Sequence, residues 1–166
     1  MSEYLEVVVD SIRVSLTSQQ RVIVLKDLND EIYLPIWIGT FEAESIVVAL
    51  QQIEVSRPQT HDLLRSVIEA LNAKLKRVEL SKIQADTFYS NLVLEVNEQE
   101  FQVDCRPSDA ISLAIRCRVP ILVDMDVLVT AGIREEKDIR LSQSVLDDVF
   151  KPVEPEEPYD SSQDTG

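Results

Sequence analysis

The sequence predicts an α+β domain with antiparallel or mixed β-meanders and helices packed on one side of the sheet. Two observations lead to this fold class. Hydrophobic residues make up 45% of the 166 residues, which suits one domain with a sizeable core. Segments with the two-residue period of strands come in groups, and each group is followed by segments with helical spacing. Grouped strands followed by helices are typical of α+β folds.

The first half of the chain has the pattern of a three-stranded meander over residues 5–38. Strands are predicted over 5–16, 21–26 and 32–38, where hydrophobic and polar residues alternate or β-branched residues cluster. Asn29-Asp30 suits a tight turn between the second and third strands. Pro35 cannot donate a hydrogen bond to a neighbouring strand, so we expect a sheet edge or a bulge there.

Two helices should follow this meander. After Gly39, hydrophobic residues recur at helical spacing from 43 to 53, and they do so again from 63 to 71. Thr60 is the predicted N-cap of the second helix, and Asn72 is its predicted C-terminal stop.

The second half repeats the scheme of strands followed by a helix. Strands are predicted over 74–83, 87–96 and 101–105, a helix after Arg106-Pro107 with Ser108 as its cap, and a buried strand over 120–123. Short helices are expected over 124–132 and 142–150. Because Arg57-Pro58 and Arg106-Pro107 both open helices, they suggest an internal duplication of a meander-plus-helix unit, although helix capping alone explains them equally well.

We divide the chain into a domain over 1–133, a helical extension over 134–150 and an acidic tail over 151–166. The tail holds three prolines, five acidic residues and one lysine. Such a segment has too little apolar surface to offset the entropy lost on ordering, so we expect it to be disordered. The predicted core of the domain contains Ile36, Ile38, Ile46, Leu50, Leu64, Val67, Leu92, Leu94, Val103, Ile111 and Ile115.

The formal net charge of −14 argues against a broad basic surface for nucleic acid. A polyanion that binds this chain would need a local basic site or a bridging cation. The sequence has no run of 18 apolar residues, and Met1 to Tyr4 do not resemble a signal peptide. Cys105 and Cys117 are therefore expected to be reduced thiols, and the protein is expected to be cytoplasmic and not bound to a membrane.

Three segments combine a predicted helix start with chemically active side chains: residues 38–44, 57–63 and 104–111. Free N–H groups and the positive end of the helix dipole favour anions there. Arg57 and Arg106 have forked guanidinium groups suited to phosphate, and Thr60 and Ser108 could add hydroxyl groups to a substrate site.

Carboxylates in the same segments predict a divalent-cation site. Glu42, Asp104 and Asp109 are the candidate ligands for Mg²⁺ or Mn²⁺, and no organic cofactor is expected. His61, Asp62, Asp104 and Asp109 are the candidate catalytic residues. His61 is the only histidine, which excludes a site with several histidine ligands. No spacing in the sequence fixes a metal by itself.

Each of these features also has a simpler explanation. Glu42 could merely complement a helix dipole, and Thr60 and Ser108 could be plain caps. Arg57 and Arg106 could pair with aspartates in a structural network. A site with a functional role should be open to solvent and near Glu42. A structural network would join the two halves of the chain without an open cleft.

The same segments resemble the signatures of the bifunctional nuclease family. The matching stretches are residues 34–39 with Glu42-Ala43, residues 57–63, residues 87–89 and residues 104–114, in that order along the chain. The resemblance covers about residues 5–132, and Cys105 and Ser112 are mild departures from the family pattern. It implies a nuclease that degrades both DNA and RNA, with nucleic acid as the partner.

We therefore expect a metal-assisted phosphodiesterase, and the alternative is a non-catalytic binding or regulatory domain that forms an oligomer. An exposed meander edge would favour a homo-oligomer. The functional hypothesis requires a group of side chains to converge although they are far apart in sequence. This group is Arg57, His61, Asp62, Asp104, Arg106 and Asp109.

Overall fold

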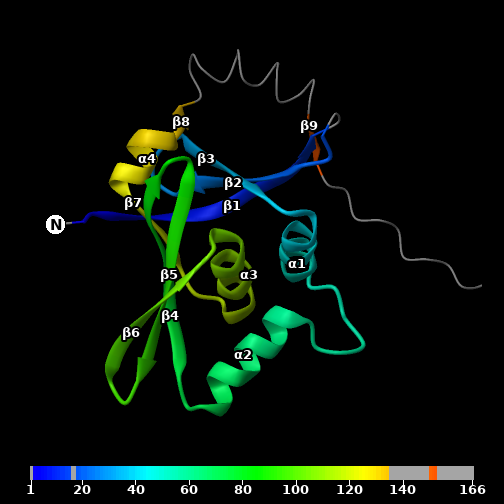
Figure 1. Cartoon of the computed structure of the whole chain (residues 1–166), viewed down its shortest axis with the longest axis vertical. Helices are drawn as coiled ribbons and strands as arrows, with labels where there is room; N and C mark the ends of the chain where they lie inside the picture. Colours follow the sequence, from blue (N-terminus) through cyan, green and yellow to red (C-terminus); the bar gives the residue numbers. More distant parts are fainter. Residues whose placement is uncertain (1, 16–17, 135–149, 153–166) are drawn as a thin grey trace, which may run out of the picture.

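The computed structural model describes residues 2–15, 18–134 and 150–152 of the chain (Figure 1). The strands are β1 (Tyr4–Ser15), β2 (Arg21–Asp27), β3 (Ile32–Ile38), β4 (Lys74–Gln84), β5 (Thr87–Val96), β6 (Gln99–Cys105), β7 (Ile121–Asp124), β8 (Ile133–Arg134) and β9 (Phe150–Pro152). The helices are α1 (Thr40–Leu50), α2 (Thr60–Ala70), α3 (Pro107–Cys117) and α4 (Met125–Ala131). This arrangement confirms the predicted α+β class.

One mixed sheet joins both halves of the chain. Its strand order is β6-β5-β4-β7-β1-β2-β3-β8, and β9 pairs with β1. Every described pairing is antiparallel except β4 with β7, which is parallel. In Figure 1, β1–β3 run across the top and β4–β6 run down the side, so the bent sheet lies on two sides of α3. Helix α3 packs against α1, α2, β4 and β5, which places it at the centre of the fold.

The first strand shows how local pattern and sheet geometry agree. The side chains of β1 that lie in or against the core are Leu5, Val7 and Val9 at odd positions and then Ile12 at an even one, and the register with β2 shifts between Val9 and Ser11. A bulge that adds one residue explains this change of phase. At the other side of the meander, β8 pairs only with Ile32 and Tyr33 of β3. Pro35 therefore lies at an edge within the part of the chain that is described, as predicted.

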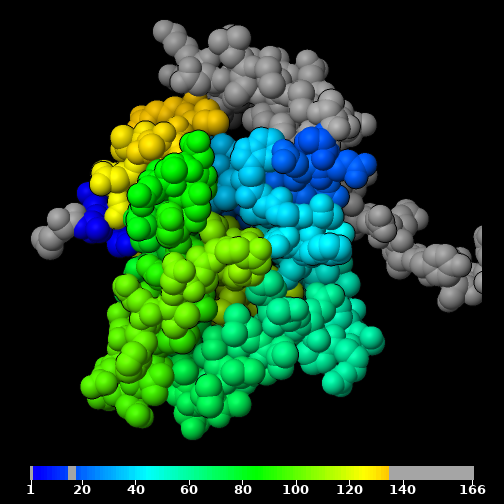
Figure 2. All heavy atoms as spheres, viewed as in Figure 1, coloured from blue at the N-terminus to red at the C-terminus, as the bar shows by residue number. Residues whose placement is uncertain are grey.

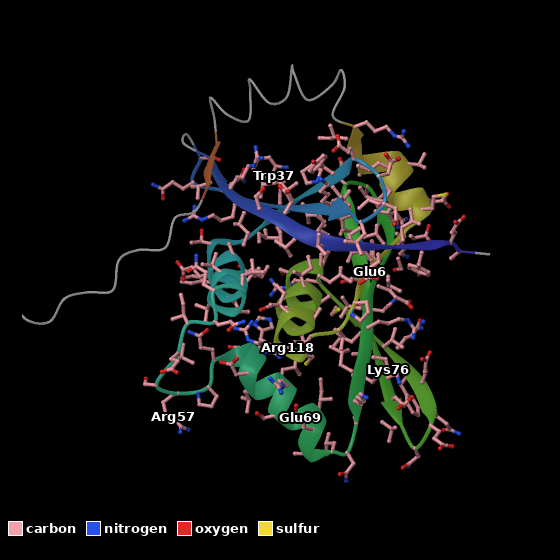
Figure 3. All side chains as sticks on the ribbon, turned by 180° about the vertical axis from the view of Figure 1, so that it is seen from behind. Glu6, Trp37, Arg57, Glu69, Lys76 and Arg118 are labelled. Atoms are coloured by element: carbon pink, nitrogen blue, oxygen red, sulfur yellow. The ribbon has the colours of Figure 1, made fainter. Side chains whose placement is uncertain are left out.

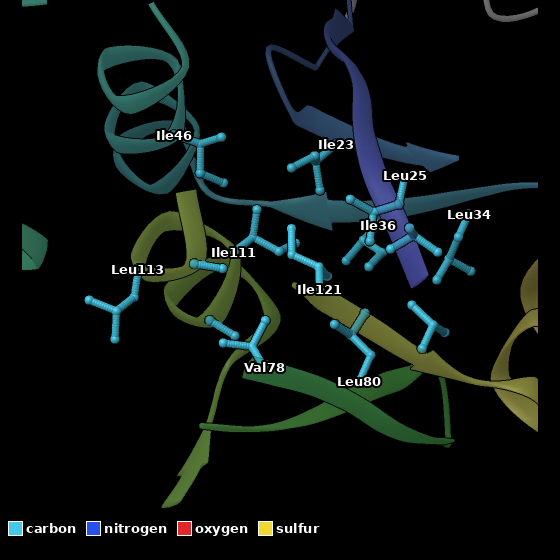
Figure 4. Close-up of a cluster of buried hydrophobic side chains, with 14 of the residues drawn as sticks. Ile23, Leu25, Leu34, Ile36, Ile46, Val78, Leu80, Ile111, Leu113 and Ile121 are labelled. Atoms are coloured by element: carbon cyan, nitrogen blue, oxygen red, sulfur yellow. The ribbon is translucent and has the colours of Figure 1, made fainter. Parts of the chain in front are cut away.

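A single main core lies between the sheet and the helices. Figure 4 shows side chains from β2, β3, α1, α3, β4 and β7 meeting in this core. Most of the predicted core residues are buried or pack against it. Leu50, Val67 and Val103 are exceptions, each more than 40% exposed. Val103 is exposed because β6 is the last strand of the sheet. Leu50 and Val67 lie on helix faces turned away from the core.

The helix ends differ in detail from the prediction. The N-cap of α2 is Gln59, which forms a capping box with Asp62, and Thr60 is already the first helical residue. The N-cap of α3 is Arg106, so Ser108 lies inside the helix and is buried. Asn72 has a φ of 57°, the left-handed conformation that commonly ends a helix. The predicted stop of α2 is therefore confirmed.

The two Arg-Pro motifs do not occupy matching places in the two halves of the fold. Each three-stranded meander is followed by a helix, α1 in the first half and α3 in the second. The Arg57 motif, however, follows α1, whereas the Arg106 motif directly follows β6. The two motifs thus occupy different places in their halves, and the fold does not show a duplication.

The C-terminal part of the chain is described only at Phe150–Pro152. These residues form β9 and pair with Arg13–Ser15, so Phe150 lies in a strand and not in the helix predicted over 142–150. The other residues of the predicted helical extension and of the predicted tail, over 135–149 and 153–166, lie outside the described residues. Among the helices that are described, none has the length and apolar character needed to span a membrane.

Candidate active site

The beginnings of α1, α2 and α3 form the walls of an open groove of about 610 Å³. Figure 2 shows the yellow-green surface around the start of α3 between the cyan surface of α1 and the green surface of β4–β6. The helices meet here because α3 packs on both α1 and α2. The residues that line the groove are Phe41, Glu42, Glu44, Ser45, Val48, Pro58, Gln59, Thr60, His61, Arg106 and Asp109.

His61 is held at both ring nitrogens. Its Nε2 lies 3.0 Å from Oδ1 of Asp109, and its Nδ1 lies 2.9 Å from Oγ of Ser45. The histidine is 9% exposed, so the ring has little freedom to turn. Three helices thus fix one imidazole: α2 carries it, and α1 and α3 supply its partners.

Arg106 joins the groove wall of α1 to that of α3. Its Nε and Nη2 donate to the two carboxylate oxygens of Asp109 at 2.8 and 3.1 Å, and its Nη1 donates to Glu42 at 2.8 Å. The side chain of Arg106 is 63% exposed, so its guanidinium group remains open to a ligand in the groove. Gly39 keeps space for this arrangement, because a Cβ atom there would collide with the carboxylate of Glu42.

A second set of hydrogen bonds leads from the groove into the interior of the protein. Ser45 lies 2.8 Å from Oγ of Ser112, and that oxygen accepts a hydrogen bond from Nη1 of Arg116 at 2.6 Å. Arg116 also donates to Asp62 at 2.7 Å, and its side chain is only 6% exposed. We call the connected residues the His61 network: Glu42, Ser45, His61, Asp62, Arg106, Asp109, Ser112 and Arg116.

The donors and acceptors of the network fix the direction of its bonds. Arginine can only donate and an ionised carboxylate can only accept, so Arg116 donates to Ser112 and His61 donates from Nε2 to Asp109. A neutral His61 then accepts at Nδ1, which requires Ser45 to donate to it and Ser112 to donate to Ser45. The basic nitrogen of His61 therefore faces the Ser45 hydroxyl.

The carboxylates of the network are held in their ionised form. Burial alone would raise the pKa of Asp109, but hydrogen bonds from Arg106 and His61 outweigh it and lower that pKa. For Asp62, the opposing effect of burial is overcome by Arg116 and the Gln59 amide, so its pKa is also lowered. The pKa of Glu42 is lowered by its own backbone N–H and by Arg106.

The structure brings together most, but not all, of the predicted site residues. His61, Arg106, Asp109 and Glu42 meet in the groove, as expected. Arg57 is exposed on the loop before α2 and points away from the groove (Figure 3). Asp104 is exposed on the edge strand β6 and does not line the groove. The expected convergence of these two residues with the others was therefore wrong.

The remaining predicted residues have different surroundings. Thr60 lines the groove, whereas the carboxylate of Asp62 turns to Arg116 behind it. Ser108 is buried in α3 and is not part of the groove wall. No three carboxylate, histidine or cysteine side chains of the described segments are placed to hold a metal together. Glu42 and Asp109 share Arg106 instead, and Asp104 does not join them, so these residues do not fit the expected three-ligand site.

Ser45, Ser112 and Arg116 were not among the predicted site residues. A signal for them exists, because Ser45 follows Glu42 by three residues, and Ser112 and Arg116 follow Asp109 by three and seven. Side chains at these spacings lie on one face of a helix. A polar stripe on two otherwise apolar helices would have indicated that the two faces meet.

Comparison with known proteins identifies the family. A sequence profile described as the bifunctional nuclease domain matches residues 23–136, which is more than half of the chain. The chain belongs to the bifunctional nuclease domain family. The matched range contains every residue that lines the groove, so the candidate site lies inside the bifunctional nuclease domain.

Relatives of this bifunctional nuclease domain occur in bacteria and plants. An uncharacterized protein of Mycobacterium tuberculosis is 42% identical over 86% of this chain and 87% of its own length. Bifunctional nuclease 1 of Oryza sativa subsp. japonica is 28% identical over 87% of this chain. Bifunctional nuclease 2 of Arabidopsis thaliana is 26% identical over 66%. The matched part is 45% of the rice protein and 34% of the Arabidopsis protein, so these plant proteins are much longer than the match.

The lowered carboxylate pKa values of the bifunctional nuclease domain predict a loss of stability in acid. At acid pH the unfolded chain binds more protons than the folded one, so the free energy of unfolding rises with pH there. Asp62 and Asp109 should contribute fully to the free energy of unfolding above their ordinary pKa of 3.8. This contribution should be lost as the pH falls through their lower pKa values in the folded protein. Urea unfolding between about pH 2 and pH 5 measures this, and Asp109→Asn should show a smaller decline. Equal declines in both proteins would contradict the prediction.

Proposed function

We propose that the chain hydrolyses phosphodiester bonds of DNA and RNA in the groove at the start of α1, α2 and α3. The observation that carries the proposal is a histidine fixed at both nitrogens beside an exposed arginine fork in an open groove. A positioned histidine is the side chain most often used for proton transfer near neutral pH. The family and the names of the plant relatives support this choice of reaction.

Each residue of the groove has a role in the proposed reaction. Arg106 binds a phosphate oxygen of the substrate with its exposed guanidinium. Water attacks phosphorus and gives its proton to the Ser45 hydroxyl, which passes its own proton to Nδ1 of His61. The bond from phosphorus to the leaving sugar oxygen breaks, and His61 returns the proton to that oxygen. Asp109 fixes the orientation of the ring and stabilises its charged form.

A divalent cation remains part of the hypothesis, although the described residues do not supply the three ligands that we expected. Since Glu42 and Asp109 both contact Arg106, a cation bound by them would have to compete with the guanidinium. The proposed steps therefore use the side chains alone. Assays with Mg²⁺, Mn²⁺ and EDTA decide whether cleavage requires a cation.

The alternative is a non-catalytic binding or regulatory domain. It is favoured by the continuity of the His61 network, which joins three helices and includes the buried side chain of Arg116. Such a network would stabilise the fold even without a reaction. We also propose a cytoplasmic location, in keeping with the reduced thiols expected for Cys105 and Cys117.

The test of the proposed function is a cleavage assay with the purified chain. Single-stranded and double-stranded DNA and RNA are incubated with it at neutral pH, with Mg²⁺, with Mn²⁺ and with EDTA. Fractions across a size-exclusion peak are assayed, and cleavage should follow the protein concentration. The proposal fails if cleavage separates from the protein peak or is absent for every substrate and cation.

We predict that the chain is a homo-oligomer. The exposed edge strand β6 has two large apolar side chains on its surface, Phe101 and Val103, which are 50% and 44% exposed. Unpaired strand edges with apolar residues favour association. Light scattering at micromolar concentration should give a multiple of the 18.8 kDa chain mass. A monomer mass would contradict the prediction.

A further inference from the structure

A pocket with four cationic residues in its lining lies at the other end of α2 and α3, away from the groove. Its volume is about 440 Å³. Arg65, Lys74, Lys76 and Arg118 line it together with a single acidic residue, Glu69. Figure 3 shows Arg118 at the end of α3, Glu69 on α2 and Lys76 on β4. We call this the basic pocket, and it stands out on a chain with a net charge of −14.

Two of the four cations that line the basic pocket are paired with carboxylates. Arg65 pairs with Glu69, and Lys76 pairs with Glu95 at 3.2 Å. Lys74 and Arg118 are exposed, and no ion pair or hydrogen bond of their side chains is found within the described residues. Two full positive charges therefore remain available to an anion.

Two electrostatic effects oppose binding of an anion here, and both are smaller than this charge. Helices α2 and α3 both end at the pocket, and each C-terminus carries about half a negative charge. Acidic groups on the rest of the surface act only weakly beyond a Debye length of about 10 Å at 0.1 M salt. At 0.1 M salt the local field is therefore positive, and a polyanion can bind although the whole chain is acidic.

The position of the basic pocket relates it to the groove. Helix α3 starts at the groove with Asp109 in its first turn and is followed at its other end by Arg118. At about 1.5 Å per residue, the two ends are about 14 Å apart along the helix. That distance corresponds to about four nucleotides at the 3.4 Å spacing of a stacked strand. A strand that extends from the groove along α2 and α3 would thus reach the basic pocket with its backbone.

We propose that the basic pocket binds backbone phosphates of a single-stranded nucleic acid whose cleaved bond lies in the groove. The proposal rests on the proposed function, which it extends by naming where the strand is held. Lys74 and Arg118 are the binding residues, because they are the exposed cations of the pocket that lack a carboxylate partner among the described residues. This site supplies the local basic surface that an acidic chain needs for a polyanion.

The test measures binding apart from cleavage. A fluorescently labelled 12-nucleotide single strand is titrated in EDTA, with His61→Ala as the background, and anisotropy is recorded from 20 to 200 mM salt. Lys74→Gln with Arg118→Gln should weaken binding at least tenfold at low salt. The slope of log K against log salt should decrease by about 1.4, because each neutralised phosphate of a single strand contributes about 0.7 to that slope.

A matched control removes two charges elsewhere. Arg21→Gln with Lys82→Gln changes the net charge equally, and neither residue lines the basic pocket. It should change affinity less than twofold. Equal weakening by both double variants would show a general charge effect and overturn the proposal, as would no binding or an unchanged affinity in the Lys74 and Arg118 variant. If inorganic phosphate at 1 mM displaces the strand completely, the pocket is a small-anion site and the proposal also fails.

The binding test and the cleavage assay can fail independently of each other. A chain that binds the strand through Lys74 and Arg118 but cleaves nothing would retain the basic pocket and lose the proposed function. A chain that cleaves but binds equally well without these two cations would show the reverse.

Discussion

Replacing His61 with alanine is expected to lower the rate of phosphodiester cleavage by about 10²–10⁴-fold, the usual contribution of a positioned acid–base group. The reason is that Nδ1 of His61 is the basic nitrogen in the groove. The fold should survive, because Asp109 keeps its bonds to Arg106 and Ser45 keeps its bond to Ser112. The measurement is the initial rate at saturating substrate, with circular dichroism as the check on folding.

Two further results strengthen the test of His61. Added imidazole should restore part of the cleavage by the alanine variant, since the deleted ring leaves space beside Asp109 and Ser45. Ser66→Ala, on the exposed face of the same helix, is the control and should retain the full rate. An alanine variant that is folded and cleaves at the normal rate would exclude His61 from the reaction.

Replacing Asp62 with alanine is expected to cost about 3–5 kcal/mol of unfolding free energy. The change leaves the charge of Arg116 without its carboxylate in a position where the side chain is 6% exposed. It also removes the acceptor of the Gln59 amide in the capping box, which contributes about 1 kcal/mol. Urea unfolding at pH 7 measures the loss.

A second variant separates the buried charge from the cap. Adding Arg116→Met to Asp62→Ala removes the unpaired charge, so the double variant should be more stable than Asp62→Ala alone. Glu69→Ala breaks the exposed pair with Arg65 and should cost less than about 0.5 kcal/mol. A cost for Asp62→Ala as small as that for Glu69→Ala would show that the buried part of the His61 network does not stabilise the fold.

The fold was largely predictable because it depends on patterns that are local in the sequence. The alternation of hydrophobic and polar residues predicted the strands of both meanders. The hydrophobic positions change from odd to even between Val9 and Ile12, and this change corresponds to the bulge in β1. The exposure of Val103 was not predictable in this way. It depends on β6 being the last strand, and strand order is set by long-range packing that a single strand's pattern does not contain.

The candidate site was predicted in part, for a related reason. His61, Arg106 and Asp109 stand in helix starts, whose charged groups are visible as local motifs. Arg57 has a similar motif but lies on the loop after α1, and its exposed side chain points away from the groove. The partner that does bind Asp62 is Arg116, which is 54 residues later in the chain. Only the packing of α2 on α3 brings these two together.

The most direct test of a reaction centred on His61 compares two aspartates of the same segment. Asp109→Asn and Asp104→Asn remove one negative charge each with almost no change in shape, and the two positions are five residues apart. Asp109 contacts His61 and Arg106, whereas Asp104 lies outside the groove on β6. With both variants purified in parallel, Asp109→Asn should lower cleavage of DNA and RNA at least about a hundredfold. Asp104→Asn should cleave like the unaltered chain. Equal rates in the two variants, or loss of cleavage in Asp104→Asn alone, would contradict a reaction centred on His61.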